Sequence, residues 1–596
     1  MNGIRVMDWL ENKFQKKALP YGAIAAFALI AYSNSFTVPF ILDDFGSISN
    51  NYDIHQLFDF AALWKFYANR IVLYFLLSLN YAIHDNAVAG YHITNLLIHI
   101  LNGILLYMIL KKLLALPYFI GKLLSQYGTS IPVIAAILFV IHPMQVNAVT
   151  YIVQRTASLA ATFYMLAILF FIKYRVQDKL YQLLLTFLFI VIAMFTKENT
   201  ITIPFMLLLI EFMFFLKDGK TTWYKRILIF LPLLAAVPII PGTNLLLKGY
   251  SQSDPNVSFK ASTSMDRFQY FFTELNVIIL YIKLMFIPDK QNFDYSNDFP
   301  MSQTIWDNYS YVSFIILSLI GLFSLYTMKR NRLVSFGILW FFTGLAVESS
   351  FISIKDVYFE HRLYFPTAGF IMFLIGIIMY EKKRKLSEPH LLQKPVLFLL
   401  VVSFVFIPLY TGLTIRRNYI YSDSIRLWSD VVSRAPGSDR AHSVLATGYL
   451  NAYDEKKMNT EYLDLAEQEF KKAIDLYYYN STAHSNLSKV YLLKGEYQKS
   501  IDEAERTLNI TKSEYAQFNL GSAYKKLGKT QKALDAFKAG YEYNKRSTFI
   551  LKALGDTYYE TGDFTNAKKY YEEYLENNKR FNNKDVEEKL KKIEKK

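Results

Sequence analysis

Long apolar runs alternate with short polar segments through residues 1–415. A helix needs about 20 predominantly apolar residues to cross a membrane. The segment 265–287 is apolar but interrupted by charges, and we interpret it as a helix that lies on the membrane or dips into it. The remaining pattern predicts eleven spans, at 18–38, 90–111, 130–148, 150–172, 180–196, 199–216, 227–241, 308–328, 333–353, 362–380 and 395–415.

The C-terminal part of the chain contains an internal repeat. Leu487, Leu520 and Leu554 each begin a Leu-(Gly/Ser)-x-x-Tyr pattern, at spacings of 33 and 34 residues. This period is typical of tetratricopeptide repeats (TPRs), in which paired helices stack on the next pair. An earlier copy with an insertion near 453–460 and a charged capping helix at 583–596 complete the predicted array.

Together the two patterns predict an all-α protein. We expect a polytopic transmembrane helical bundle in residues 1–422, followed by a TPR α-solenoid of about four repeats in residues 423–596.

The formal net charge of +15 indicates the orientation of the chain in the membrane rather than a nucleic-acid partner. In a soluble protein it would suggest nucleic-acid binding, whereas here the cations gather in alternate loops between the apolar runs. Cytoplasmic loops carry an excess of Lys and Arg, so we expect the N-terminus inside, the TPR domain outside and no nucleic-acid partner. If the segment 265–287 also crossed the membrane, the predicted orientation of every later segment would be reversed. The cationic loops lie at 5–17, 111–122, 173–179, 217–226, 329–332 and 382–394.

The composition narrows the chemistry and the compartment. The absence of cysteine excludes disulfides, thiolate catalysis and cysteine-ligated metals. The first apolar run has no small-residue cleavage site, so we do not expect a cleaved signal peptide. Heavy use of Lys, Asn, Ile and Tyr suggests an AT-rich bacterial genome, and therefore a bacterial inner membrane.

Polar and ionisable residues collect at one end of the predicted spans, the end that this topology places outside. Such groups are costly at membrane level and usually functional, so the clustering predicts one site. The alternative is that each is an ordinary interfacial residue. The set comprises Asp43, Asp44, His142, Arg155, Lys197, Glu198, Glu348, Glu360, His361 and Arg362.

Asp43 and Asp44 form an adjacent acidic pair directly after the first predicted span. Two carboxylates this close repel one another, which raises the pKa of one and suits a general base. The pair also suits a cation, and the simplest alternative is a solvated turn.

The position of this pair resembles that in the GT-C glycosyltransferases, which carry an acidic pair in the first outer loop. Further stretches follow in the order seen in TMTC proteins, the TPR-bearing O-mannosyltransferases, and their bacterial relatives. The sequence departs from the animal proteins at Glu360-His361-Arg362, where they have Ala-Glu-Arg, which leaves the role of His361 open. The matching stretches are Tyr32-x-Asn34-Ser35, Asp43-Asp44, Arg70, Asn80, Tyr91-His92, His142-Pro143-x-Gln145, Arg155, Lys197-Glu198, Asp294-Tyr295, Glu348-Ser349 and Glu360-His361-Arg362.

The resemblance implies an inverting transfer of a sugar, mannose or another hexose, from a polyprenyl-phosphate donor to a hydroxyl of an extracytoplasmic protein. It implies Asp43 as the base and Asp44 as the residue that holds or tunes it, although the sequence does not rank the two. Arg side chains suit the departing phosphate through their planar fork. The histidines orient groups or, alternatively, pack helices together. The implied donor-phosphate and substrate-binding residues are Arg362, Arg155, Lys197, Glu198, His142, Glu360, His361, His92 and Arg70.

No metal is expected at this site, because an Asp-Asp pair lacks the full ligand set of Ca²⁺ or Mg²⁺. The lipid-linked sugar is then the required co-substrate, and a divalent ion stays an open possibility. The TPR groove could present a protein or peptide acceptor, or it could only assemble complexes. Two other functions remain open: an oligosaccharide ligase or polymerase, and a non-catalytic membrane-anchored TPR scaffold.

Overall fold

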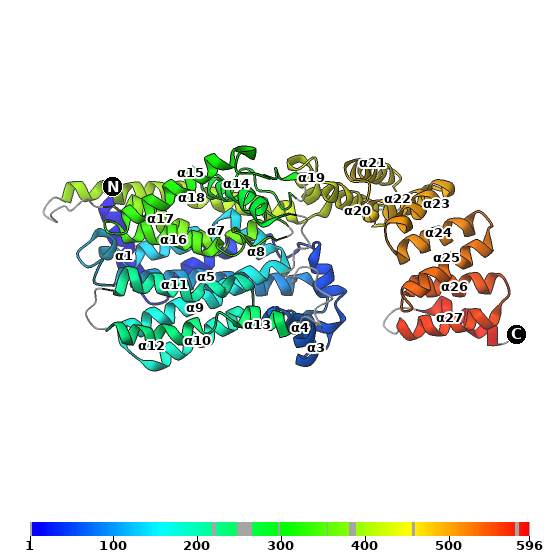
Figure 1. Ribbon diagram of the computed structural model, residues 1–596, viewed down its shortest axis with the longest axis horizontal. Helices are drawn as coiled ribbons and strands as arrows, with labels where there is room; N and C mark the ends of the chain where they lie inside the picture. Colours follow the sequence, from blue (N-terminus) through cyan, green and yellow to red (C-terminus); the bar gives the residue numbers. More distant parts are fainter. Residues whose placement is uncertain are drawn as a thin grey trace. The chain divides into compact units, whose positions relative to one another are not determined.

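The computed structural model describes residues 3–216, 222–246, 265–295, 298–354, 356–380, 389–455, 459–578 and 583–594. Every regular element in these ranges is helical (Figure 1), which confirms the all-α prediction. The helices form two compact units, Met1–Asp294 with Phe299–Leu427, and Tyr295–Asp298 with Trp428–Lys596. The cationic segments 217–221 and 381–388 and part of the predicted insertion, 456–458, lie outside the described residues.

The first unit contains the apolar helices. Its longer helices are α1 (Gly3–Phe14), α2 (Leu19–Ala31), α3 (Phe60–Tyr67), α4 (Ile71–His84), α5 (Val88–Leu114), α7 (Ser130–Ile141), α9 (Arg155–Gln177), α10 (Leu180–Met194), α11 (Ile203–Ile210), α12 (Trp223–Leu234), α13 (Ile239–Leu246), α14 (Arg267–Phe286), α15 (Ser310–Thr327), α16 (Arg332–Leu345), α17 (Pro366–Ile378) and α18 (Pro389–Tyr421). Short helices are α6 (Leu123–Gln126), α8 (Val146–Thr150), η1 (Phe45–Ser49), η2 (Tyr52–His55), η3 (Ala68–Arg70), η4 (Pro143–Gln145), η5 (Ile152–Gln154), η6 (Glu198–Thr202), η7 (Glu211–Phe215), η9 (Asp307–Tyr309) and η10 (Glu360–Leu363).

Six described helices have the length and composition to cross a membrane, and a pair bent by 54° would make a seventh, Ser130–Ile141 with Pro143–Thr150. The predicted count of eleven therefore stays a prediction. The predicted span at 227–241 is divided between α12 and α13, and α4 is an apolar helix that the sequence pattern did not single out. The six are Val88–Leu114, Ile152–Gln177, Glu198–Phe215, Arg267–Phe286, Asp307–Thr327 and Lys394–Tyr421.

Among these candidate spans is α14, which corresponds to the segment 265–287. It is one continuous helix of 20 residues, capped at its start by the Asp266 carboxylate, which accepts the Phe268 N–H. Its length and composition therefore permit a full span. Whether it crosses the membrane or lies on it remains a prediction.

The helices of the first unit pack closely through small residues and expose apolar side chains on the outside. A Cβ atom at Gly337 of α16 would lie 2.6 Å from the Gly369 carbonyl oxygen of α17, so only glycine allows this approach. On α15, Phe314, Leu319 and Leu322 are exposed. An apolar surface of this extent is unfavourable in water and suits a lipid environment.

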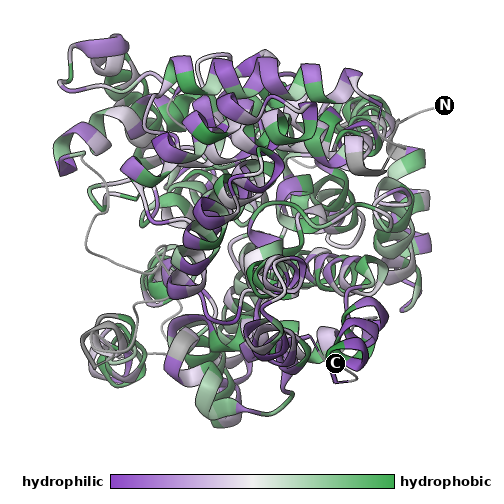
Figure 2. Ribbon diagram, turned by 90° about the vertical axis from the view of Figure 1, so that its right-hand side faces the viewer, coloured by the Kyte–Doolittle hydropathy of each residue, from purple (hydrophilic) through white to green (hydrophobic). Residues whose placement is uncertain are grey.

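The second unit is a stack of paired helices. Gly495, Gly528 and Gly562 end the first helix of successive pairs with positive φ angles of 79°, 72° and 80°, as the turns of the predicted repeats require. Around these helices hydrophilic and hydrophobic residues alternate (Figure 2). The helices are α19 (Ser424–Arg434), α20 (Asp439–Glu455), α21 (Glu461–Leu476), α22 (Ser481–Lys494), α23 (Tyr497–Ile510), α24 (Glu514–Lys526), α25 (Thr530–Tyr543), α26 (Thr548–Glu560), α27 (Phe564–Asn577) and α28 (Lys584–Glu594).

Close contacts between paired helices explain the small positions of the repeat. A Cβ atom at Gly521 would lie 2.5 Å from the Phe537 ring, and one at Gly555 would lie 2.5 Å from the Tyr571 ring. The predicted capping helix corresponds to α28, although residues 595–596 lie outside the described part of the chain.

Candidate functional site

The connection between α7 and α9, residues 142–155, is buried along most of its length and forms the centre of the site. Pro143 cannot continue the hydrogen-bond ladder of α7, so the helix breaks and restarts as η4, α8 and η5. Breaking the ladder leaves backbone N–H groups and side chains of this segment available for distant parts of the chain. We call residues 142–155 the hub segment.

Asp44 is fixed by the hub segment. Its carboxylate accepts the Val153 N–H at 2.7 Å and the Ile41 N–H at 2.9 Å, and the residue is fully buried. Burial raises the pKa of Asp44 to about 7, an effect that the two backbone N–H groups partly oppose.

Asp43 has a different environment, although it is the adjacent residue. It is exposed, and its backbone N–H donates to the Tyr151 hydroxyl at 3.1 Å. Leu42, directly before the pair, has a φ angle of +40°, which is strained for a residue with a Cβ atom. The loop thus anchors Asp44 and presents Asp43.

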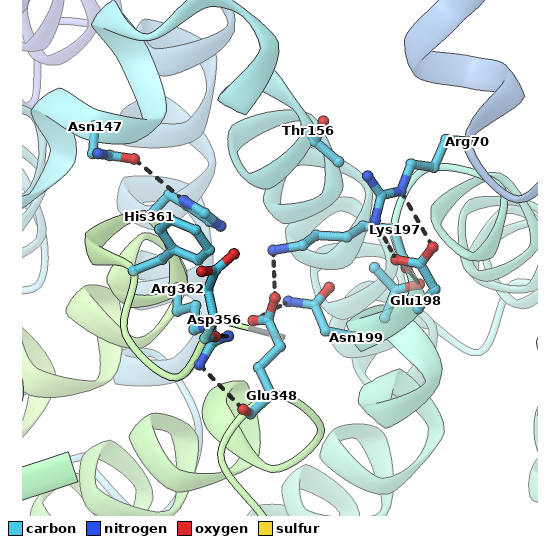
Figure 3. A network of polar contacts seen from close by, with 12 residues as sticks. Arg70, Asn147, Thr156, Lys197, Glu198, Asn199, Glu348, Asp356, His361 and Arg362 are labelled. Carbon is cyan, nitrogen blue, oxygen red and sulfur yellow. Dashed lines mark hydrogen bonds and ion pairs between the residues drawn. The ribbon is translucent and has the colours of Figure 1, made fainter. Parts of the chain in front are cut away.

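Lys197, Glu348 and Arg362 belong to a charged network drawn in Figure 3. The Lys197 ammonium lies 2.7 Å from a Glu348 carboxylate oxygen, and the other oxygen accepts the Asn199 amide at 3.2 Å. The Arg362 guanidinium donates to the Glu348 backbone carbonyl at 3.3 Å. Segments far apart in sequence therefore meet at Glu348.

The chain itself surrounds the Arg362 guanidinium. It donates to the carbonyls of Val357 and Asp356, both at 2.7 Å, and pairs with Glu274 of α14 at 3.3 Å. Arg362 is 3% exposed. This geometry suits a residue that fixes the late loop to α14, and its predicted contact with a phosphate remains a prediction.

Arg70 and Glu198 form a two-pronged ion pair at the edge of the network (Figure 3). Arg70 Nε and Nη2 donate to the two Glu198 oxygens at 3.2 and 3.3 Å. Their side chains are 25% and 17% exposed, more than those of the other ion pairs in this network. The Arg70 guanidinium is thus the most exposed arginine group of this charged network.

Glu360 and His361 face two different sides of the site. Glu360 accepts hydrogen bonds from Gln291 and Tyr358, both at 3.3 Å, and lies 3.9 Å from Arg417. His361 lies 3.2 Å from the Asn147 side-chain oxygen of the hub segment. Burial, followed by the charges of Lys197, Arg362 and Arg70, lowers the pKa of His361, so its imidazole is neutral at neutral pH.

Arg155, His92 and His142, which the sequence predicted to bind substrate, form hydrogen bonds with other parts of the chain and lie outside the charged network described above. Arg155 is fully buried and donates to Asn95, Asn80 and the Tyr91 carbonyl. His92 donates to the Val38 carbonyl at 2.8 Å and His142 to the Met285 carbonyl at 3.2 Å. These contacts suit helix packing, the alternative role for the histidines, and ligand roles for the three residues remain predictions.

Several residues of the site were not singled out from the sequence. Tyr151 holds Asp43, Asn147 holds His361, and Gln291 donates to both Glu360 and the Pro143 carbonyl. Glu274 was visible only as a charge that interrupts an apolar run. In the described ranges, no group of three or more His, Asp or Glu side chains has the arrangement of a metal site.

The two units define a class: an all-α protein with apolar helices of membrane-spanning length and a TPR array. The tetratricopeptide repeat family model matches residues 515–546 and 553–581. The apolar helices and the relatives described next indicate an integral membrane protein.

The chain is similar to TMTC-type protein O-mannosyl-transferases, the resemblance that its motifs predict. Protein O-mannosyl-transferase F38B6.6 of Caenorhabditis elegans is 24% identical over 435 residues, which cover 70% of this chain and 58% of that protein. TMTC1 of Homo sapiens is 23% identical over 533 residues, 78% of this chain and 56% of that protein. TMTC3 of Mus musculus is 26% identical over 208 residues, 32% of this chain and 20% of that protein. The chain thus matches little more than half the length of F38B6.6 and of TMTC1.

Among solved structures, the crystal structure of MamA aligns with 26% of this chain and 87% of its own, at 21% identity and a TM-score of 0.23. The Cut9–Hcn1 crystal structure covers 88% of this chain and 89% of its own, at 14% identity and a TM-score of 0.27.

Proposed function

We propose that this chain is an integral membrane glycosyltransferase that transfers mannose or another hexose from a polyprenyl-phosphate donor to a hydroxyl of an extracytoplasmic protein. One observation supports this proposal above all. Asp43 is exposed on a strained loop, while the adjacent Asp44 is hydrogen-bonded to the hub segment. We infer a mannosyl group and a protein acceptor from the names of the relatives, which are protein O-mannosyl-transferases.

In this proposal the acidic loop activates the acceptor hydroxyl, and the charged network stabilises the leaving phosphate. The Asp43 carboxylate takes the proton of the acceptor hydroxyl, and the acceptor oxygen forms a bond to the anomeric carbon of the sugar. The bond from that carbon to the phosphate oxygen breaks, and polyprenyl phosphate leaves with the electron pair. Attack on the face opposite the phosphate inverts the anomeric centre.

Positive charge is needed where the phosphate leaves, and this electrostatic stabilisation is usually the largest contribution to catalysis. Arg70 suits this role best because its side chain is partly exposed, and Lys197 pairs with Glu348 in the same network, whereas backbone carbonyls and Glu274 occupy the Arg362 guanidinium. Arg362 positions the late loop, and Arg155 positions the helices around the hub segment. Glu198 and Glu348 hold the two cations.

The TPR unit offers a surface for the acceptor protein. On α24 and α26 the rings of Tyr515 and Phe549 stack with centroids 5.1 Å apart, and Phe518 meets Phe549 edge-on at 5.2 Å. Tyr515 is 61% exposed. Aromatic anchors of this kind dominate the binding energy of protein interfaces, so this cluster supports peptide binding.

The decisive experiment measures sugar transfer by the purified full-length protein in lipid nanodiscs, with a radiolabelled polyprenyl-phosphate mannose and an extracytoplasmic protein fraction. Asp43→Asn should lower kcat about 100-fold or more, because removal of a general base costs a factor of this order. The protein should still fold and bind donor.

The control is Asp53→Asn, a change of the same type in the neighbouring helix η2. Full transfer by Asp43→Asn would contradict the assignment of the base. An absence of transfer by the wild type to any acceptor, with the donor intact, would contradict the proposed activity.

A further inference from the structure

Asn292 carries a buried side chain with no hydrogen-bond partner among the described residues. Its exposed fraction is 0%, and neither the amide oxygen nor the amide nitrogen is paired. A carboxamide offers two N–H donors and two lone pairs, and leaving such a group buried and unpaired is unfavourable. This unfavourable burial calls for an occupant that pairs with the amide in the working protein.

The neighbours of Asn292 in the chain bring it to the candidate site. On one side, Gln291 donates to the Pro143 carbonyl at 3.0 Å and to Glu360 at 3.3 Å. On the other side, the Phe293 ring lies 5.2 Å from the Tyr151 ring and 5.5 Å from the Tyr421 ring. Tyr151 is the residue whose hydroxyl accepts the Asp43 N–H. Asn292 is therefore held between two side chains that contact the hub segment.

The hub segment contains a second buried carboxamide with an unpaired atom, which supports the same conclusion. Gln145 is fully buried, and its amide nitrogen donates to the Tyr364 carbonyl at 3.4 Å, while its amide oxygen has no partner among the described residues. Unpaired carboxamide atoms thus occur both on the hub segment and on the loop packed against it.

The chemistry around Asn292 favours a neutral hydroxyl over an anion. The Glu360 carboxylate, which Gln291 contacts, offsets the charge of Arg417 3.9 Å away, and the amides themselves carry no charge. A hydroxyl group can donate to an amide oxygen and accept from an amide N–H. Aromatic rings beside such amides suit a carbohydrate, which has apolar C–H faces and hydroxyl edges.

We propose that the Asn292 carboxamide binds a hydroxyl group of the sugar carried by the lipid donor. This inference rests on the proposed function and deepens it, because it assigns recognition of the sugar to the loop 291–293, separately from recognition of the phosphate by Lys197 and Arg70.

The test uses Asn292→Leu in the full-length protein in nanodiscs. Leucine has nearly the shape of asparagine and no polar atoms, so the thermal midpoint of the protein without ligand should stay unchanged or rise. Affinity for polyprenyl-phosphate mannose should fall about tenfold or more, whereas affinity for polyprenyl phosphate without a sugar should stay unchanged. Asn292→Ala, which needs no change in the surroundings, should give the same selective loss.

The matched control is Asn86→Leu, at an exposed asparagine of the same unit, which should change neither affinity. Equal affinity of the Asn292 variants and the wild type for the mannosyl lipid would overturn the inference, as would an equal loss for both lipids or an effect confined to the KM of the acceptor. A wild type that binds both lipids equally would overturn sugar recognition altogether, and absence of donor binding by the wild type would overturn the proposed function as well.

Discussion

Asp43 and Asp44 show how one turn of backbone gives neighbouring carboxylates different roles. The Asp44 carboxylate is occupied by two backbone N–H groups, so it cannot also take a proton from an acceptor without disrupting the loop. The Asp43 backbone N–H donates to the Tyr151 hydroxyl, and the residue is exposed, so its carboxylate can face a substrate. This division favours Asp43 as the base and Asp44 as the residue that positions it.

Asp44 should make folding stability depend on pH. The pKa of Asp44 rises from 3.8 to about 7 on folding, so the folded protein binds this proton more tightly than the unfolded chain. Its contribution to the free energy of unfolding is complete below pH of about 4 and is lost as the pH rises to about 7.

Thermal unfolding of the wild type and of Asp44→Asn at pH 5 and pH 8 tests this prediction. The variant should unfold at a lower temperature at pH 5, because the hydroxyl oxygen of the protonated Asp44 carboxyl can still accept an N–H, whereas the NH2 group of an amide cannot. It should also lose less stability than the wild type between the two pH values. Asp43→Asn is the control and should retain the wild-type loss. Equal losses for the wild type and Asp44→Asn would show that Asp44 does not carry this pH dependence.

At the scale of elements, the broken helix of residues 142–155 organises the site, and Arg155 at its end links α9 to α4 and α5. Arg155→Met should lower the free energy of unfolding by about 3 kcal/mol, since it leaves buried oxygens of Asn80, Asn95 and Tyr91 without a donor. Chemical denaturation in detergent, followed by tryptophan fluorescence, measures this change.

Lys179→Met removes an equivalent charge from an exposed position and is the control for Arg155→Met. The packing role of Arg155 would be wrong if the two variants had the same stability. A loss of sugar transfer by Arg155→Met with unchanged stability would instead indicate contact with the substrate.

In the TPR unit, contact between Gly521 and Phe537 determines how closely α24 and α25 pair. Gly521→Ala places a methyl group where the ring lies and should destabilise this pair by about 1–3 kcal/mol. Phe537→Leu in the same chain should recover part of that loss by making room.

Hydrogen exchange of the α24 and α25 peptides within the full-length protein measures both effects. Lys526→Ala, at an exposed position of α24, is the control and should leave the exchange rates unchanged. If Gly521→Ala exchanges as slowly as the wild type, the close contact does not limit stability.

At the scale of the whole molecule, the orientation in the membrane decides whether Asp43 and a lipid-linked sugar share a compartment. The natural chain has no cysteine, so single cysteines give an unambiguous label. We expect a membrane-impermeant maleimide to label Gly46→Cys and Lys526→Cys in intact cells, and Lys179→Cys only after permeabilisation. These residues are all exposed.

Two results would change this topology. Labelling of Gly46→Cys only after permeabilisation would place the acidic pair on the cytoplasmic side and exclude the proposed reaction there. Labelling of Gly46→Cys but not Lys526→Cys in intact cells would show that α14 crosses the membrane and inverts the later segments.

Much of the architecture follows from local pattern. The apolar runs and the repeat of Leu487, Leu520 and Leu554 predict helices because periodicity and length are encoded in neighbouring residues. The ordered motifs, with the acidic pair first, also predict the relationship to the TMTC proteins and most of the polar residues that meet in the charged network.

The partner of each polar residue depends on contacts between distant segments, which no local pattern specifies. Tertiary structure separates Asp43 from Asp44, because the buried N–H of Val153 comes from another part of the chain. It likewise occupies Arg155 and Arg362 with oxygens of the chain, and it brings Gln291 and Asn292, which the sequence did not single out, to the hub segment. The sequence alone indicated most of the polar residues that meet at the candidate site, while folding decided which partners each of them has and how exposed each one is.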